Sequence, residues 1–156
     1  MIERVRAAAV GDAAVLAWLD SEARARLVDR RGGPEWLAEV AEWNELDAAR
    51  FVGSPDCCVL VAELDDVAVG YAAASCAGAI CRIERLYVDP EARELGLGEE
   101  MLDQLMDFAV RTGVERIEST ALPGDRETKN LFERFGMKAR LLVVSRPLTE
   151  PDDDAS

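Results

Sequence analysis

The sequence predicts an α+β fold, in the element order β-α-α-β-β-β-α-β-α-β. Two observations carry this prediction: apolar runs joined by Leu64-Asp65-Asp66 indicate a hairpin, and segments with apolar residues at helical spacing lie before and after it. The chain has 156 residues, 49% of them hydrophobic, which is enough for one core without disulfides or a metal. We expect residues 1–148 to form a single domain and residues 149–156 an acidic disordered tail.

The first half of the chain predicts a strand, two helices and the hairpin. Residues 1–6 alternate apolar and charged side chains, a short strand pattern. Asp12 is expected as the N-cap of a helix that ends before Arg30. Pro34 begins a second helix, whose apolar side carries Trp36, Leu37, Val40, Ala41 and Trp43. The hairpin strands are the apolar runs at 59–63 and 67–74.

The second half predicts three strands and two helices. A strand at 80–88 ends at Asp89-Pro90, because proline has no N–H and restricts the residue before it. From Gly98 an amphipathic helix runs to Gly113, its C′ glycine. We expect a strand at 116–121, a helix that Asp125 caps and that closes at Gly136, and a last strand at 138–146.

Composition limits the chemistry that the chain can perform. It has no His, so nucleophile pairs built on His and the commonest transition-metal ligand are excluded, and we expect no metal. The 18 Lys and Arg against 31 Asp and Glu give a net charge of −13, which argues against a nucleic-acid partner. Two explanations of the negative charge remain: it favours a basic partner, or it only keeps the protein soluble.

The cysteines and the hydropathy pattern indicate the cellular compartment in which we expect the protein. Cys57, Cys58, Cys76 and Cys81 lack zinc-site spacing and are expected to be buried free thiols in a reducing cytosol. No apolar run is long enough to cross a membrane, and the N-terminus lacks a signal-peptide pattern. We therefore expect a cytoplasmic protein with no membrane partner.

The stretch Ile83 to Glu100, IERLYVDPEARELGLGEE, carries the most chemical information. A strand is followed by a proline break, an arginine, two glycines and a helix. Free amides at a helix start favour an anion, and glycines let a phosphate approach the backbone. The stretch lacks the third glycine of a dinucleotide fingerprint and the Gly-Lys-Ser/Thr of a nucleotide P-loop.

The pattern Val88-x-Pro90-x-x-Arg93-x-x-Gly96-x-Gly98 strongly resembles the pyrophosphate-binding segment of the GNAT superfamily of acyl-CoA N-acyltransferases. The segment from Leu131 to Met137, LFERFGM, resembles the second signature of that family, Leu-Tyr-Glu-Lys-Leu-Gly-Phe. The resemblance covers residues 2–148 and is strongest over 84–137. It implies a central mixed, mostly antiparallel sheet flanked by helices, and acetyl-CoA as co-substrate.

The resemblance also assigns residues to the cofactor site. The strand that ends at Val88 should splay from the strand at 116–121, and the pantetheine arm should lie in the wedge between them. Strand residues Leu86, Tyr87 and Val88 would line that arm. The pyrophosphate would be held by the loop and helix start, namely Arg93, Glu94, Leu95, Gly96, Leu97, Gly98 and Glu99.

The sequence departs from the family pattern in three respects. Glu94, Glu99 and Glu100 surround the phosphate loop, where basic or neutral residues are more common, although acidic residues also suit a helix start. Asp125 replaces a frequent Asn, which leaves helix capping as its role. Phe132 replaces the tyrosine that often protonates the departing thiolate, and a phenyl ring cannot donate a proton.

Acyl transfer to an amine needs a base, because an alkyl amine is mostly protonated at pH 7. Glu84 is the first candidate, since alternation along its strand would place it on the side of Leu86 and Val88. A salt bridge or a solvated position is an equal alternative for this residue. The other candidates are Glu118 and Thr120 as bases, and Tyr87, Tyr71 or water as proton donors.

Two functions remain open at this point. One is an N-acetyltransferase that moves an acetyl group from acetyl-CoA directly to a primary amine of a small molecule or protein. The other is a degenerate acyl-CoA-binding or sensing module without turnover. The acidic composition favours a cationic amine, whose pocket would come from the two N-terminal helices and the loops around 30–34 and Asp89. A homodimer is an open alternative for assembly.

Overall fold

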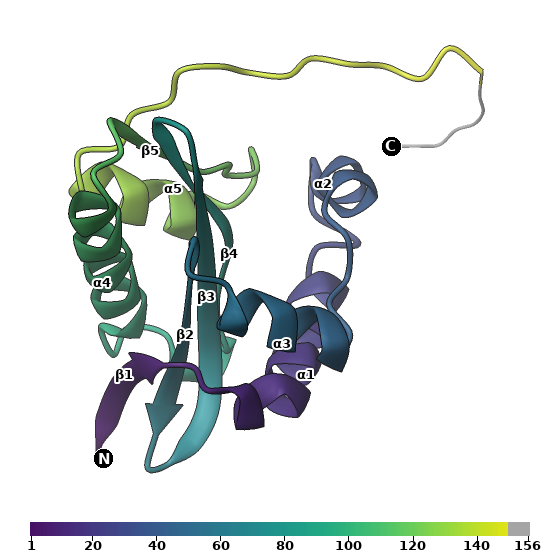
Figure 1. Ribbon diagram of the computed structural model, residues 1–156. Helices are drawn as coiled ribbons and strands as arrows, with labels where there is room; N and C mark the ends of the chain where they lie inside the picture. The colour runs from purple at the N-terminus through teal and green to yellow at the C-terminus, as the bar shows by residue number, and fades with distance from the viewer. Residues whose placement is uncertain (150–156) are drawn as a thin grey trace.

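The computed structural model describes residues 1–149 (Figure 1). Its strands are β1 (Glu3–Ala7), β2 (Cys57–Leu64), β3 (Val67–Ala77), β4 (Ile80–Val88) and β5 (Arg116–Glu118). Its α-helices are α1 (Ala13–Ala25), α2 (Gly33–Glu39), α3 (Glu45–Gly53), α4 (Leu97–Thr112) and α5 (Arg126–Arg134). Two short 3₁₀ turns, η1 (Val10–Asp12) and η2 (Pro90–Ala92), precede α1 and α4.

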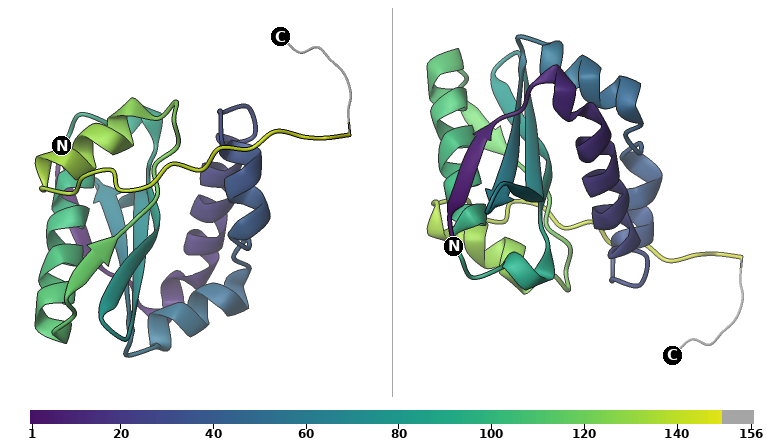
Figure 2. Two further views of the ribbon diagram at one scale, coloured as in Figure 1. Left: turned by 90° about the horizontal axis from the view of Figure 1, so that it is seen from above. Right: turned by 90° about the horizontal axis from the view of Figure 1, so that it is seen from below.

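The five strands form one sheet in the order β1-β2-β3-β4-β5. The first four are antiparallel neighbours, and β5 pairs parallel to β4. Helices α4 and α5 lie on one face of the sheet, and α1, α2 and α3 lie on the other (Figures 1 and 2). This confirms the predicted fold class, a mixed, mostly antiparallel sheet between helices.

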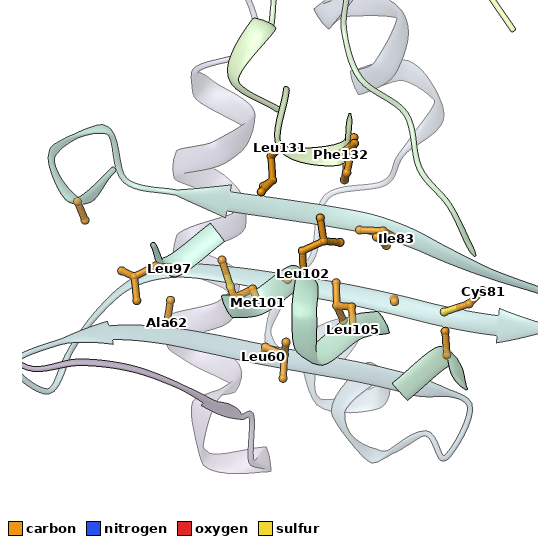
Figure 3. Packing of buried hydrophobic residues seen from close by; sticks show 14 residues of the cluster. Leu60, Ala62, Cys81, Ile83, Leu97, Met101, Leu102, Leu105, Leu131 and Phe132 are labelled. Carbon is orange, nitrogen blue, oxygen red and sulfur yellow. The ribbon is translucent and has the colours of Figure 1, made fainter. Parts of the chain in front are cut away.

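The larger core lies between the sheet and α4 (Figure 3). Met101, Leu102 and Leu105 on α4 are fully buried against β-strand residues such as Leu60 and Ile83. Burial of each such side chain is worth roughly 1.5–3 kcal/mol, so this face of α4 anchors the helix firmly. Gly113, at φ 85°, ends α4 as the predicted C′ glycine. The start of α4 is therefore held in a fixed place beside β4.

The element order differs from the prediction in two particulars. A separate helix, α3, follows α2, because Asn44 begins a new helix by accepting a hydrogen bond from Asp47 N–H, and Asp47 returns one to Asn44 N–H. The predicted second helix therefore ends at Glu39, and Trp43 lies outside it. The predicted last strand at 138–146 is not formed within the described residues. That segment is extended and exposed.

Two further predictions concern the ends of the chain and membranes. The predicted acidic tail lies, apart from Thr149, outside the described residues, so the division at residue 148 remains a prediction. Over residues 1–149, no helix combines the length and the apolar character that crossing a membrane requires.

Candidate active site

A wedge opens between β4 and β5, as predicted. The two strands pair over only three positions, Ile80 to Arg82 with Arg116 to Glu118. Ser119 Oγ then donates to Ile83 O at 2.9 Å, and beyond this contact the two strands diverge. Residues 84–88 of β4 consequently have no strand neighbour on the side of β5 among the described residues. Their backbone on that side is available to a ligand, except for Val88 O, which accepts a hydrogen bond from Arg93 Nε.

The wedge continues into a cleft of about 410 Å³. Its walls come from β4, the residues after β5, the loop before α4 and the first turn of α4, with α5 at one side and α1 and α2 at the other. Every predicted cofactor-site residue lines the cleft except Leu95, which packs against the core. Glu84 and Thr120 also line it, whereas Glu118 is absent from the lining of the described residues.

The loop before α4 presents free backbone donors to the cleft. Gly96 adopts φ +82°, a left-handed conformation that glycine tolerates, and it caps the helix. The first backbone bond of α4 is Glu100 N–H to Gly96 O at 3.0 Å. The amides of Leu97, Gly98 and Glu99 thus have no backbone acceptor in the described part of the chain. Such amides, beside the positive end of the helix dipole, favour an anion.

Two of the three acidic residues around this loop have local partners. Glu99 binds Arg134 of α5 at 2.6 Å, and Glu100 accepts a hydrogen bond from Gln104 at 2.9 Å. Arg93 donates from Nε to Val88 O at 3.1 Å and binds Glu127 through Nη1 at 2.6 Å. The guanidinium therefore lies at the cleft, with a surface carboxylate as its present partner.

A β-bulge determines where Glu84 points. Ala74 pairs with Ile83 and Ala73 pairs with Arg85, so Glu84 is the extra residue of β4. Glu84 accepts a hydrogen bond from Ser75 Oγ, and Ser75 shares its sheet face with Ala73, on the side of α1. The expectation from alternation is therefore wrong. Leu86 and Val88 pack on the α4 side, whereas Glu84 enters the cleft from the opposite face.

The hydroxyl groups of Tyr71 and Tyr87 differ in whether they can donate a proton to a ligand in the cleft. The Tyr71 hydroxyl donates to buried Asp20, and burial together with that carboxylate raises the pKa of Tyr71 well above its ordinary value. Tyr87 lines the cleft, and its hydroxyl accepts a hydrogen bond from Arg26 Nε at 3.4 Å. Because the Tyr87 oxygen accepts from Arg26, its own proton remains available to another acceptor.

A buried ion pair fixes β4 next to the bulge. Arg85 lies 3.6 Å from Asp20, donates to Ala41 O at 2.6 Å and covers the Trp43 ring at 4.4 Å from its centroid. The backbone N–H of Trp43 donates to the other Asp20 oxygen at 2.8 Å. These contacts tie α1, the segment before α3 and β4 together. These contacts explain how the charges of Arg85 and Asp20 can be buried. The periodicity of the sequence does not predict this burial.

Phe132 and Asp125, which depart from the family pattern, contribute to the core and to a helix cap. Phe132 is 7% exposed, belongs to the core and lines the cleft with its ring. Asp125 caps α5 by accepting from Thr128 N–H at 3.1 Å, which confirms the capping role. Sequence reasoning did not single out four cleft residues, namely Arg26, Ser119, Asn130 and Arg134; the first three lie outside the recognised motifs, and Arg134 lies within the LFERFGM segment without an assigned role.

Comparisons with known proteins agree with this geometry. A sequence model of the acetyltransferase (GNAT) family matches residues 16–137. The chain is 21% identical to a single-residue mutant of the BH1408 protein from Bacillus halodurans, with a TM-score of 0.78 and coverage of 96% of this chain and 100% of that one. No curated protein sequence matches the chain.

Two further solved structures were determined with ligands. The PaiA N-acetyltransferase from Thermoplasma acidophilum, in complex with coenzyme A, is 14% identical, with a TM-score of 0.73 over 90% of this chain and 92% of that one. AAC(6')-Iy, in complex with a bisubstrate analogue of CoA and acetylneamine, is 15% identical, with a TM-score of 0.67 over 96% of this chain and 100% of that one. At these identities the likeness concerns the fold.

Proposed function

Because the chain belongs to the acetyltransferase (GNAT) family, we propose that it transfers an acetyl group from acetyl-CoA directly to a primary amine. One observation carries this proposal: the wedge between β4 and β5 leads to the free amides of Leu97, Gly98 and Glu99. An extended thioester arm fits the wedge, and an anionic group fits the amides.

The cleft meets this co-substrate with suitable groups. The amides at the start of α4, together with Arg93, would hold the pyrophosphate. Residues 84–88 of β4 offer backbone groups to the amides of the pantetheine arm. Leu86, Val88 and Phe132 supply apolar surface around the arm. Bound there, acetyl-CoA supplies an activated acyl group.

We assign two proton-transfer roles within this cleft. Glu84, half-buried and fixed by Ser75, takes a proton from the acceptor amine directly or through a water. Tyr87 donates a proton to the departing thiolate, because Phe132 cannot and Tyr71 is tied to Asp20. Both residues lie on β4, one on the bulge and the other three residues later.

The acceptor enters from the side of the N-terminal helices. There the charged residues that line the cleft are Arg26 and Arg30, while Leu27 and Trp36 supply apolar surface. This wall is basic although the chain as a whole is acidic. It therefore supports an amine that carries an anionic or neutral group over the cationic amine that composition favours.

The experiment is a direct assay of turnover. Release of free CoA thiol from acetyl-CoA is measured with amino acids, peptide N-termini, polyamines and aminoglycosides as acceptors. Thiol release with at least one amine, together with the acetylated product by mass spectrometry, supports the proposal. Tight binding of acetyl-CoA without release from any amine supports the second candidate, a binding module, which Phe132 in the cleft favours.

Two expectations about the setting remain proposals. The described cysteines are free, and burial raises the pKa values of Cys57 and Cys58 and raises that of Cys81 to about 12. Thiols of this kind are consistent with a reducing compartment, and we propose the cytoplasm. We also propose a homodimer.

A further inference from the structure

Residues 138–148, defined here as the C-terminal arm, leave the body of the protein as an extended segment (Figures 1 and 2). Every residue of the arm is exposed, and its large apolar side chains are more than 80% exposed: Leu141, Leu142, Val143, Val144 and Leu148. Single exposed apolar residues are common, but four in succession on an unpaired chain indicate a missing contact.

The arm has the sequence of a covered strand. Leu141 and Val143 fall on one side of an extended chain, and Leu142 and Val144 fall on the other. Apolar residues on both sides are typical of a strand with both faces packed. The last backbone hydrogen bond at the base of the arm is Met137 N–H to Phe132 O at 3.0 Å, and the described residues beyond it make none. The backbone of the arm thus lacks partners.

The body has a matching open edge at β5. This strand pairs with β4 on one side, and its other edge ends the sheet. Two apolar residues of the stretch that contains β5, Val114 and Ile117, are only half-buried, although they pack against the main core. The extended stretch at 114–122 and the arm residues 138–146 are each nine residues long. An added strand would complete both the ladder and this part of the core.

Charge favours the same contact. The arm carries Lys138, Arg140 and Arg146 and no carboxylate, on a chain of net charge −13. The rest of the chain is therefore more acidic than the whole. The arm is attracted to an acidic body, and its three cations offset part of the repulsion between two such bodies.

The direction of the arm decides which body it contacts. From α5 it runs across the molecule toward the side of α2 and away from β5 (Figures 1 and 2). We propose that the arm adds as a strand to the β5 edge of a second copy of this chain, whose own arm returns the contact. Such a reciprocal exchange gives a closed two-fold dimer and covers both open edges.

The first experiment measures molar mass by light scattering across a dilution series. The whole chain and a chain ending at Leu148 should both be dimers, and a chain ending at Met137 should be a monomer that still melts cooperatively. The double variant Leu142→Asp and Val144→Asp keeps the full length and should also be monomeric. Lys138→Ser is its matched control and should remain dimeric. A monomeric whole chain, or a dimer that survives the two aspartates, overturns the proposal.

The second experiment separates exchange from folding back onto the same chain. A photoreactive p-benzoylphenylalanine replaces Leu142, and the illuminated protein is analysed by denaturing gel and peptide mass spectrometry. The expected product is a covalent dimer with the cross-link within residues 114–122. The same probe at exposed Val67, the first residue of β3, should give no covalent dimer. An adduct within one chain shows that the arm pairs with its own β5, which contradicts the exchange.

Discussion

Glu84 owes its position to a single extra residue in β4. Without the bulge, its side chain would share the face of Leu86 and Val88; with it, the carboxylate reaches the cleft beside Ser75. If Glu84 is the base, Glu84→Gln should lower kcat by roughly 10²-fold or more and flatten the acidic limb of the pH-rate profile. Steady-state kinetics with acetyl-CoA and an identified amine provide the measurement.

The matched control for this prediction is Glu118→Gln. Glu118 pairs with Arg82 and Arg116 on the surface, at 3.2 and 3.0 Å, and does not line the cleft. Its loss should leave kcat unchanged. Wild-type turnover in Glu84→Gln would return Glu84 to a structural role, in which it only accepts from Ser75.

Tyr87 should carry the proton to the thiolate. Tyr87→Phe should lower kcat by about 10²-fold, within the usual range for a general acid, and leave the Kd of CoA within about twofold. Phe132→Tyr should change the rate little, because Phe132 is packed in the core and a new hydroxyl there has no defined aim. A tenfold gain in Phe132→Tyr, with unchanged kcat in Tyr87→Phe, would transfer the role away from Tyr87.

At the scale of elements, a network of charges joins β1 to η1 and β2. Arg6 donates to both oxygens of Asp12, at 2.8 and 2.9 Å, and to Glu63 at 3.1 Å. The bond to Arg6 lowers the pKa of Asp12 from 3.8 to about 2. A carboxyl whose pKa is lower in the folded state stabilises the fold above its ordinary pKa and loses that contribution as pH falls through the folded value.

Asp12→Asn should therefore lower the free energy of unfolding by roughly 2 kcal/mol at pH 7. The difference from the wild type should shrink as pH falls below about 4 and vanish near pH 2. Urea unfolding at several pH values measures it, with Asp103→Asn on the exposed face of α4 as control. A difference that stays constant down to pH 2 would show that Asp12 stabilises the fold by other means.

The loop before α4 makes a prediction that involves the partner of Arg93. Arg93→Ala should weaken CoA by roughly tenfold to a hundredfold, the value of a hydrogen bond to a charged group, and leave pantetheine binding unchanged. Glu127→Gln should tighten CoA by up to about fivefold, since it frees Arg93 from a surface pair worth at most about 1 kcal/mol. Calorimetric titration measures both. Equal losses for CoA and pantetheine would place Arg93 away from the pyrophosphate.

The sequence predicted the elements that have local signals. Proline after β4, the two glycines before α4 and Gly113 after it are visible without a structure, and so the phosphate loop was predictable. The bulge at Glu84 was not, because it depends on the register of β3 against β4. The boundary between α2 and α3 was missed because Trp36 and Trp43 share helical spacing, although Asn44 and Asp47 form a capping box at the start of α3.

The C-terminal arm illustrates a second reason why structure cannot be predicted from local sequence patterns alone. Its continuous run of apolar and β-branched residues is typical of a strand, yet no strand forms in the described chain. A strand exists only with a neighbour, and the pattern does not say which chain supplies it. The individual residues of the basic cleft wall were also not predictable from local patterns. Arg26, Arg30 and Trp36 come together only through the packing of α1 and α2.

At the scale of the whole molecule, the charge of the chain and the charge of its cleft differ. The net charge is −13, yet the charged residues that line the cleft are five arginines and five carboxylates. The cleft can therefore accept an anionic co-substrate although the surface repels anions at long range. Added salt, which screens the surface, should not weaken CoA binding as steeply as it would in a uniformly basic site.

We propose that acetyl-CoA occupies the wedge with its pyrophosphate on the start of α4, and a substitution at Gly98 distinguishes this arrangement from binding elsewhere. Gly98 has no left-handed φ, and a Cβ there would meet only Leu131 Cδ2, at 3.3 Å, the end of a flexible side chain. Gly98→Val should therefore fold while its side chain fills the space of the phosphate. Gly53→Val, where an added Cβ meets nothing within 4 Å, is the control.

The measurement is calorimetric titration of CoA into the wild type and both variants, after each is shown to melt cooperatively. We predict that Gly98→Val weakens CoA by at least about a hundredfold, which corresponds to about 2.7 kcal/mol, and that Gly53→Val binds as the wild type does. Wild-type affinity in a folded Gly98→Val protein would contradict the account, because the glycine would then be only a turn residue and the pyrophosphate would have to bind elsewhere.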